Sequence, residues 1–278
     1  MFIRLGYDLQ FDVPAPLTYV AQLRVHSSRA AELREPDVVH LESTHDAGTV
    51  AIDSHEYMDG YGNICTRFVA PAGHLKIWGS TVIADSGEVD AVAWDAQEIP
   101  TAELPDEVLV FLLNSRYCEV DLLSPIAYEL FGNIAPGWGR VQAICNWVHN
   151  KVTFNYAMTR PTKTALDVFT ERVGVCRDFQ HLAVAFCRCM NIPARYAAGY
   201  LGDIGVPLRL PMDFSAWFEV YLDHKWWAFD ARNNMPRLGR VLMATGRDAA
   251  DVAFLTSFGS STLTNFYVVS EVEEQPEA

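Results

Sequence analysis

The sequence predicts an α+β protein, with an N-terminal antiparallel β-sandwich domain and a second domain of helices and strands. Residues 3–11 and 75–83 alternate between apolar and polar side chains, which is the two-residue period of a half-buried strand. After residue 105, apolar residues instead recur every three or four positions, as they do on one face of a helix. We expect these boundaries: sandwich 1–95, linker 96–108, second domain 109–268, acidic tail 269–278.

In the N-terminal domain, turn signals separate the alternating stretches. The sequences MDGYGN at 58–63 and DSG at 85–87 combine the Gly, Asp and Asn residues that tight turns favour. Short strands joined by such turns are typical of a small β-sandwich. The stretch DAQEIPTAELP that follows the domain is polar and contains two prolines, so we interpret it as a linker.

Helical patterns dominate the first part of the second domain. Residues 121–132 and 138–152 carry apolar side chains with helical spacing. The stretch GVCRDFQHLAVAFCRCMNIP at 174–193 predicts a helix that begins near Cys176 and ends before the final proline, which cannot continue a helix. The residues that follow it, 194–201, predict a strand.

A β-hairpin is predicted at residues 215–230, where apolar and polar side chains alternate on both sides of the turn sequence DHK. We assume a register in which Leu222 faces Trp226. This register places Ser215 opposite Asn233, at the open end of the hairpin.

Composition and charge exclude several classes of protein. The chain has 278 residues, half of them hydrophobic, and a formal net charge of −14, which would repel nucleic acid and anionic membranes. It has no run of about 18 apolar residues that could span a bilayer. Residues 1–13 alternate like a strand and lack the apolar region of a secretory signal. We therefore expect a cytoplasmic protein without nucleic-acid or membrane partners, and leave a homo-oligomer open.

The six cysteines lack the dense spacing of a disulfide framework, so we expect free thiols. Cys176 stands at the predicted start of a helix, where backbone N–H groups and the helix dipole favour a thiolate and lower its pKa. We therefore interpret Cys176 as a nucleophile. The alternative is a buried structural cysteine, which is how we interpret Cys187 and Cys189.

Four motifs carry a resemblance to a known family. They are GVCRDF at 174–179, NIPARY at 191–196, AWFEVYL at 216–222 and AFDARN at 228–233. In this order and spacing, the chain resembles the bacterial transglutaminase-like cysteine peptidases, which have a papain-like core. The resemblance covers residues 110–268 and implies a transglutaminase-like core in the second domain.

The resemblance implies a Cys-His-Asp triad in which a thiol attacks an amide carbonyl to form a thioester. Cys176 matches the nucleophile and Asp230 matches the acid. The position of the histidine is occupied by Ser215, whose hydroxyl cannot act as a base near neutral pH. Four further residues are candidates for a supporting role: His181, Asp178, Asn233 and Trp217.

Two functions remain open on these grounds. The first is a peptidase, amidase or acyl transferase that forms a thioester at Cys176 on a peptide or protein amide. The second is a catalytically impaired member of the family that binds peptides or serves as a partner subunit. The histidines are scattered without a helical H-x-x-x-H pattern, so we expect no metal and no cofactor.

Overall fold

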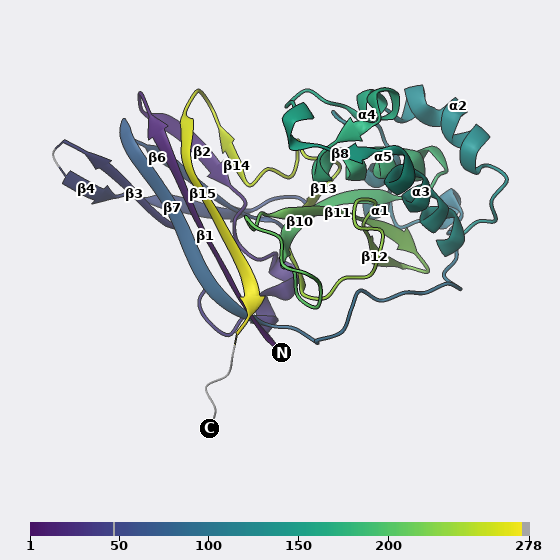
Figure 1. Ribbon diagram of the computed structural model, residues 1–278, viewed down its shortest axis with the longest axis horizontal. Helices are drawn as coiled ribbons and strands as arrows, with labels where there is room; N and C mark the ends of the chain where they lie inside the picture. The colour runs from purple at the N-terminus through teal and green to yellow at the C-terminus, as the bar shows by residue number, and fades with distance from the viewer. Residues whose placement is uncertain (47, 274–278) are drawn as a thin grey trace.

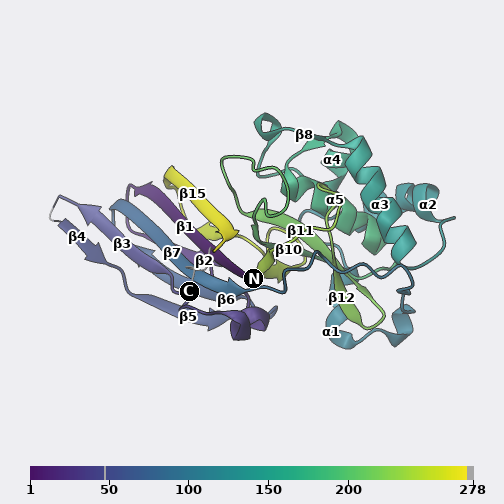
Figure 2. The ribbon, with the colours of Figure 1, turned by 60° about the horizontal axis from the view of Figure 1, so that its bottom comes forward.

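A computed structural model of the protein describes residues 1–46 and 48–273 (Figure 1). The β-rich part and the helix-containing part lie side by side, and they remain adjacent in a second orientation (Figure 2). The predicted α+β class, with a β-sandwich beside a mixed core, is confirmed. Within the described ranges, no helix is long and apolar enough to cross a membrane.

Two antiparallel sheets form the sandwich. The larger sheet has the order β15-β1-β7-β3-β4, with β15 Thr262–Val272, β1 Phe2–Val13, β7 Gly73–Ala84, β3 His40–His45 and β4 Gly48–Ala51. The smaller sheet has the order β14-β2-β6-β5, with β14 Leu255–Ser257, β2 Leu17–Ala21, β6 Ile64–Ala70 and β5 Ser54–Met58. Alternate residues of the strands, such as Leu5, Ile77 and Phe68, are buried in one shared apolar core.

The sandwich includes strands from the end of the chain, which corrects the predicted boundaries. β15 pairs with β1 and β14 pairs with β2, so residues 255–272 belong to the sheets of the N-terminal domain. The predicted tail is wrong for residues 269–272, which are the end of β15, and residues 274–278 lie outside the described part. The pairing joins positions more than 200 residues apart, and most side chains of β15 are exposed. No local alternation of apolar and polar residues therefore predicts this strand.

The core is a four-stranded antiparallel sheet packed against helices. The sheet has the order β12-β11-β10-β13, with β12 Lys225–Phe229, β11 Ser215–Leu222, β10 Ala194–Leu201 and β13 Arg240–Gly246. The main helices are α2 Val120–Phe131, α3 Trp138–Lys151, α4 Ala165–Glu171 and α5 Cys176–Cys189. Because α5 contacts β10 and β11 as well as the other three helices, residues 178–189 are all buried. α5 begins where the sequence predicted.

Short elements complete the chain. They are η1 Ser27–Glu32, η2 Thr101–Glu103, α1 Asp106–Leu109, η3 Val110–Leu112, η4 Tyr156–Met158, and the parallel pair β8 Thr153–Phe154 and β9 Val173–Gly174. η2 and α1 lie in the predicted linker, which is therefore partly ordered as helical turns.

The hairpin of β11 and β12 is confirmed, but its assumed register is wrong by one residue. Leu222 pairs with Lys225, not with Trp226, because the turn has only two central residues, Asp223 and His224. Both have positive φ angles, 46° and 61°, as a tight hairpin turn of this kind requires. The ladder with β12 ends at Phe218, so Ser215 does not pair with Asn233, and on the other side of β11 it pairs with Gly199 of β10.

The two domains share part of one apolar core. Tyr200, Phe214 and Met243 from the second domain are buried in the same cluster as the inner residues of the sandwich. Backbone hydrogen bonds also cross the junction, including one from the N–H of His26 to the carbonyl of Leu242 at 2.9 Å. The shared apolar cluster and these hydrogen bonds hold the sandwich against β10 and β13 of the core sheet.

Candidate active site

Cys176 is the first residue of α5, and it is half-buried, whereas the other five cysteines are buried. It lines a cavity of about 530 Å³ at the junction of the two domains, which we call the cysteine cavity. The core contributes Tyr196 and Ser215 to its wall, and the sandwich contributes Leu9 and Tyr19. The sulfur that the sequence singled out thus lies beside the cavity at the domain junction.

The predicted lowering of the Cys176 pKa is wrong for the unliganded protein. Burial raises the pKa of this thiol to about 11. The positive charge of Arg232 and a hydrogen bond from the backbone N–H of Arg177 lower it, whereas the charges of Asp213 and Asp230 raise it. Desolvation therefore outweighs the helix N-terminus, and the thiol is protonated near neutral pH.

Gln180, one helical turn after Cys176, joins α5 to the strands beneath it. Its Nε2 donates to Asp230 Oδ1 at 3.0 Å and to the carbonyl of Ala216 at 3.1 Å. Its Oε1 accepts from the N–H of Ala231 at 3.1 Å. The sequence analysis missed Gln180, although its spacing of four residues from Cys176 placed both on one face of the helix.

Asp230 follows β12 directly, and its carboxylate is occupied by hydrogen-bond donors. Besides Gln180, it accepts from the backbone N–H groups of Arg232 and Asn233 at 2.9 and 3.0 Å, and from Asn233 Nδ2 at 2.8 Å. Arg240 Nη2 lies 3.7 Å from Asp230 Oδ2. Asn233, a supporting candidate from the sequence, thus donates to the Asp230 carboxylate.

Ser215 begins β11 and is 8% exposed. It lines the cysteine cavity and also a second cavity of about 430 Å³, which we call the arginine cavity because Arg209, Arg232 and Arg237 line it. No histidine in the described ranges lines the cysteine cavity. His149 of α3 lines the arginine cavity and donates from Nδ1 to the carbonyl of Arg232 at 2.8 Å.

His181 is a packed structural residue and lies outside both cavities. It is fully buried, its ring stacks on Tyr117 at 5.0 Å, and its Nε2 accepts from the N–H of Ala249 at 3.1 Å. Burial lowers the pKa of His181 well below its usual value. The proposed support of Cys176 by this imidazole is therefore wrong.

Asp178 stabilises the start of α5 and does not line the cysteine cavity. It accepts from the N–H of Val175 at 3.0 Å and forms an ion pair with Arg177 at 2.9 Å. A Cβ at Gly174 would lie 2.6 Å from Asp178 Cβ, so this close approach requires glycine. Asp178 therefore supports the site by fixing the backbone on both sides of Cys176.

Trp217 also lies away from the thiol. It is 1% exposed, packs with Ala197 and Leu242, and has the Arg240 guanidinium 4.7 Å from its ring centroid. It lines neither cavity, so it does not shield Cys176.

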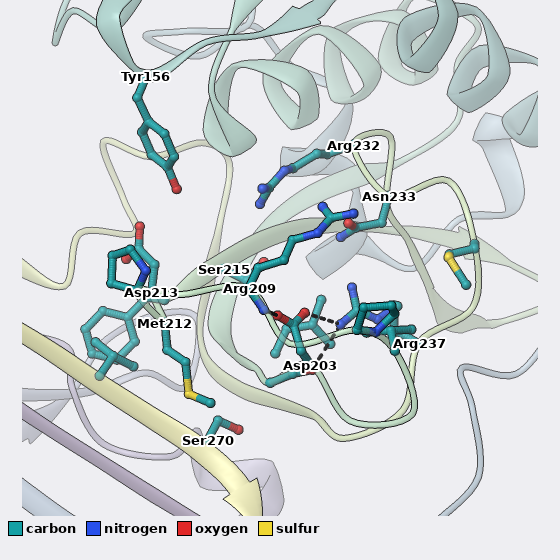
Figure 3. A pocket seen from close by; sticks show the side chains of 18 of the residues that line it. Tyr156, Asp203, Arg209, Met212, Asp213, Ser215, Arg232, Asn233, Arg237 and Ser270 are labelled. Carbon is teal, nitrogen blue, oxygen red and sulfur yellow. Dashed lines mark hydrogen bonds and ion pairs between the residues drawn. The ribbon is translucent and has the colours of Figure 1, made fainter.

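Three polar residues that the sequence analysis missed gather near Ser215. The side chains of Tyr156, Asp213 and Arg232 all line the arginine cavity (Figure 3). Burial raises the pKa of the Asp213 carboxyl, and the N–H of Phe214, the charge of Arg232 and the hydroxyl of Tyr156 oppose this shift. Tyr156 lies in the three-residue helical turn η4 and Asp213 in an irregular segment, where no periodic pattern marks a site residue.

Residues 125–231 match the sequence model of the Transglutaminase-like superfamily. The second domain is transglutaminase-like. A Mycobacterium leprae protein without an assigned function is 28% identical over 234 residues, which are 80% of this chain and 82% of its own. A similar protein of Mycobacterium tuberculosis is 26% identical over 216 residues, covering 70% of this chain and 68% of its own.

A solved structure from Cytophaga hutchinsonii, provisionally assigned as a cysteine protease, is 29% identical with a TM-score of 0.83. It covers 100% of this chain and 92% of its own, so the likeness includes the sandwich as well as the transglutaminase-like core. The resemblance inferred from four motifs is confirmed at this level. In the described residues, no group of three or more His, Cys, Asp or Glu side chains could hold a metal ion.

Proposed function

We propose that the protein is a transglutaminase-like cysteine hydrolase that forms a thioester at Cys176 with a peptide or protein amide. One observation carries this proposal. Cys176 is the half-buried cysteine of the chain, it faces a cavity at the domain junction, and Gln180 on the same helix bonds directly to Asp230. The likeness to the Cytophaga hutchinsonii structure supports a thiol hydrolase over other chemistries.

The reaction divides into two halves. In the first, the Cys176 thiol loses its proton as its sulfur bonds to the amide carbon, and the amine leaves with a proton as the C–N bond breaks. In the second, water attacks the thioester, which releases a carboxylic acid and restores the thiol. An amine in place of water would give a new amide. The first half needs a proton acceptor because the pKa of Cys176 is raised to about 11, and the second half needs one for the attacking water.

A second candidate function is a peptide-binding or partner-subunit protein with an impaired site. The observations that favour it are the cysteine cavity without a histidine in its wall and the Asn233 amide on Asp230. Loss of general acid–base help costs about 10²–10⁴ in rate, so a true hydrolase on this scaffold would be slow without another base.

The deciding experiment compares the wild type with Cys176→Ala and Ser215→His. Each protein is incubated with a library of peptide amides, and intact mass spectrometry detects an acyl adduct while amine release gives the rate. We expect an adduct and release in the wild type, neither in Cys176→Ala, and faster release in Ser215→His. Equal melting temperatures would show that all three fold. A wild type and a Ser215→His variant that both lack turnover would support the binding protein instead.

A further inference from the structure

The segment 213–215 separates the two cavities of the site. Asp213, Phe214 and Ser215 line both of them, whereas Cys176 lines only the cysteine cavity and Arg232 only the arginine cavity. Ser215, at the position of the missing histidine, and the two residues before it therefore border the cysteine cavity on one side and the arginine cavity on the other.

Asp213 is the one carboxylate in the wall of the cysteine cavity, counting the residues that the structure describes. The other titratable groups there are the Cys176 thiol, the phenols of Tyr19 and Tyr196, and the guanidinium of Arg177. Burial raises the pKa of both phenols above the usual value, and a guanidinium does not accept a proton. By elimination, Asp213 is the group in this wall that can take a proton near neutral pH.

The environments of the two aspartates near Cys176 differ in the way this role requires. Asp230 accepts from Gln180, from two backbone N–H groups and from Asn233, so its lone pairs are occupied. Around Asp213, only the N–H of Phe214 and the hydroxyl of Tyr156 act as donors that lower the pKa of the carboxyl, fewer than the donors around Asp230, which leaves acceptor capacity free. The environment of Asp230 favours a structural role, whereas the environment of Asp213 favours the exchange of a proton.

The groups that face Asp213 come from several elements. Across the arginine cavity lie His149 of α3, Tyr156 of η4 and Arg232, and across the cysteine cavity lie Cys176, Arg177 and Tyr196. Burial raises the pKa of Asp213 and so brings it nearer to that of the thiol. In return, the negative charge of Asp213 raises the pKa of Cys176.

We propose that Asp213 is a catalytic residue that replaces the missing histidine as the proton acceptor of Cys176. The step rests on the proposed hydrolase function. The Asp213 carboxylate takes the thiol proton as the sulfur bonds to the amide carbon, and the resulting carboxylic acid gives it to the departing amine nitrogen as the C–N bond breaks. In the second half, Asp213 takes a proton from the attacking water and returns it to the leaving sulfur.

Asp213→Asn tests this role. A proton acceptor at Asp213 and a negative charge that only raises the pKa of Cys176 predict opposite changes in the rate of amide hydrolysis. Without the negative charge, the pKa of Cys176 falls, and alkylation by iodoacetamide at pH 8 rises, by up to about tenfold for one pKa unit. If Asp213 is the base, release of amine from a peptide amide falls by about 10²–10⁴ in the same variant. Alkylation and hydrolysis therefore move in opposite directions.

Asp213→Glu and Asp203→Asn are the matched variants. Asp213→Glu keeps a carboxylate and is expected to recover part of the hydrolysis, together with an acidic limb of slope one in the pH profile of kcat/KM. Asp203 lines only the arginine cavity, where it pairs with Arg237 at 3.1 Å, and its neutralisation is expected to leave the ratio of hydrolysis to alkylation unchanged.

The outcomes separate this proposal from the function on which it rests. If the wild type hydrolyses amides, Cys176→Ala does not, and Asp213→Asn is unimpaired, the role of Asp213 is overturned and the hydrolase stands. Equal losses of alkylation and hydrolysis in Asp213→Asn would also overturn it, since they report a damaged cavity. A wild type without any hydrolysis that depends on Cys176 would overturn both.

Discussion

At Cys176, two opposing effects act on one sulfur atom. The helix N-terminus favours the thiolate, and burial at the domain junction favours the thiol. Burial is the larger effect here, because the pKa of Cys176 is raised to about 11 despite the N–H of Arg177 and the charge of Arg232. Helix position alone therefore does not make a cysteine reactive, and a base near the sulfur decides whether this site turns over.

Gln180 gives a prediction at the same scale. Gln180→Leu keeps the volume of the side chain but leaves Asp230, Ala216 and Ala231 each without one hydrogen-bond partner. Because Gln180 is fully buried, we expect a loss of about 1–3 kcal/mol in the free energy of unfolding for each group left unpaired. Urea denaturation measures this loss. Gln97→Leu at an exposed site is the control, expected within about 0.5 kcal/mol of the wild type.

Elements that show a pattern of apolar residues within their own sequence were predictable. A strand whose partner lies far away in the chain was not. The spacing of apolar residues placed α5 and the hairpin of β11 and β12 correctly. The two-residue turn at Asp223 and His224 shifted the register by one, because alternation fixes which face a residue occupies but not where the turn ends. β15 was missed since its partner β1 lies at the other end of the chain.

The assignment of β15 to the sandwich predicts different effects for two neighbouring residues. Val268 is 3% exposed and belongs to the apolar core, whereas Tyr267 is exposed. We expect Val268→Ala to lower the free energy of unfolding by about 1.5–3 kcal/mol, because it removes two buried methyl groups and leaves a cavity. Tyr267→Ala should change it by no more than about 0.5 kcal/mol. Equal effects in denaturant titrations would contradict the strand and its register.

At the scale of the whole molecule, the site depends on both domains. The cysteine cavity is lined by Leu9, Phe11 and Tyr19 of the sandwich, by Cys176 and Ser215 of the core, and by several residues between 249 and 266 of the returning chain. The motifs predicted Cys176, Asp230 and Ser215, at the usual position of a histidine, as site residues from the sequence. They could not identify Asp213 or the apolar wall, because a cavity between domains joins positions that no sequence period relates.

The buried state of His181 predicts how the stability of the whole molecule changes with pH. Its folded pKa lies well below the usual 6.5, so the unfolded chain binds a proton that the folded protein excludes. The stabilising contribution is therefore complete above pH 6.5 and is lost as the pH falls below it, by up to about 1.4 kcal/mol per pH unit.

His181→Gln retains an acceptor for the N–H of Ala249 but does not titrate. Although this variant is less stable at pH 8, its free energy of unfolding should fall less steeply between pH 6.5 and 5 than that of the wild type, measured by urea denaturation at each pH. His224→Asn, in an exposed turn with positive φ, is the control and should keep the slope of the wild type. Parallel curves for the wild type and His181→Gln would contradict the excluded proton.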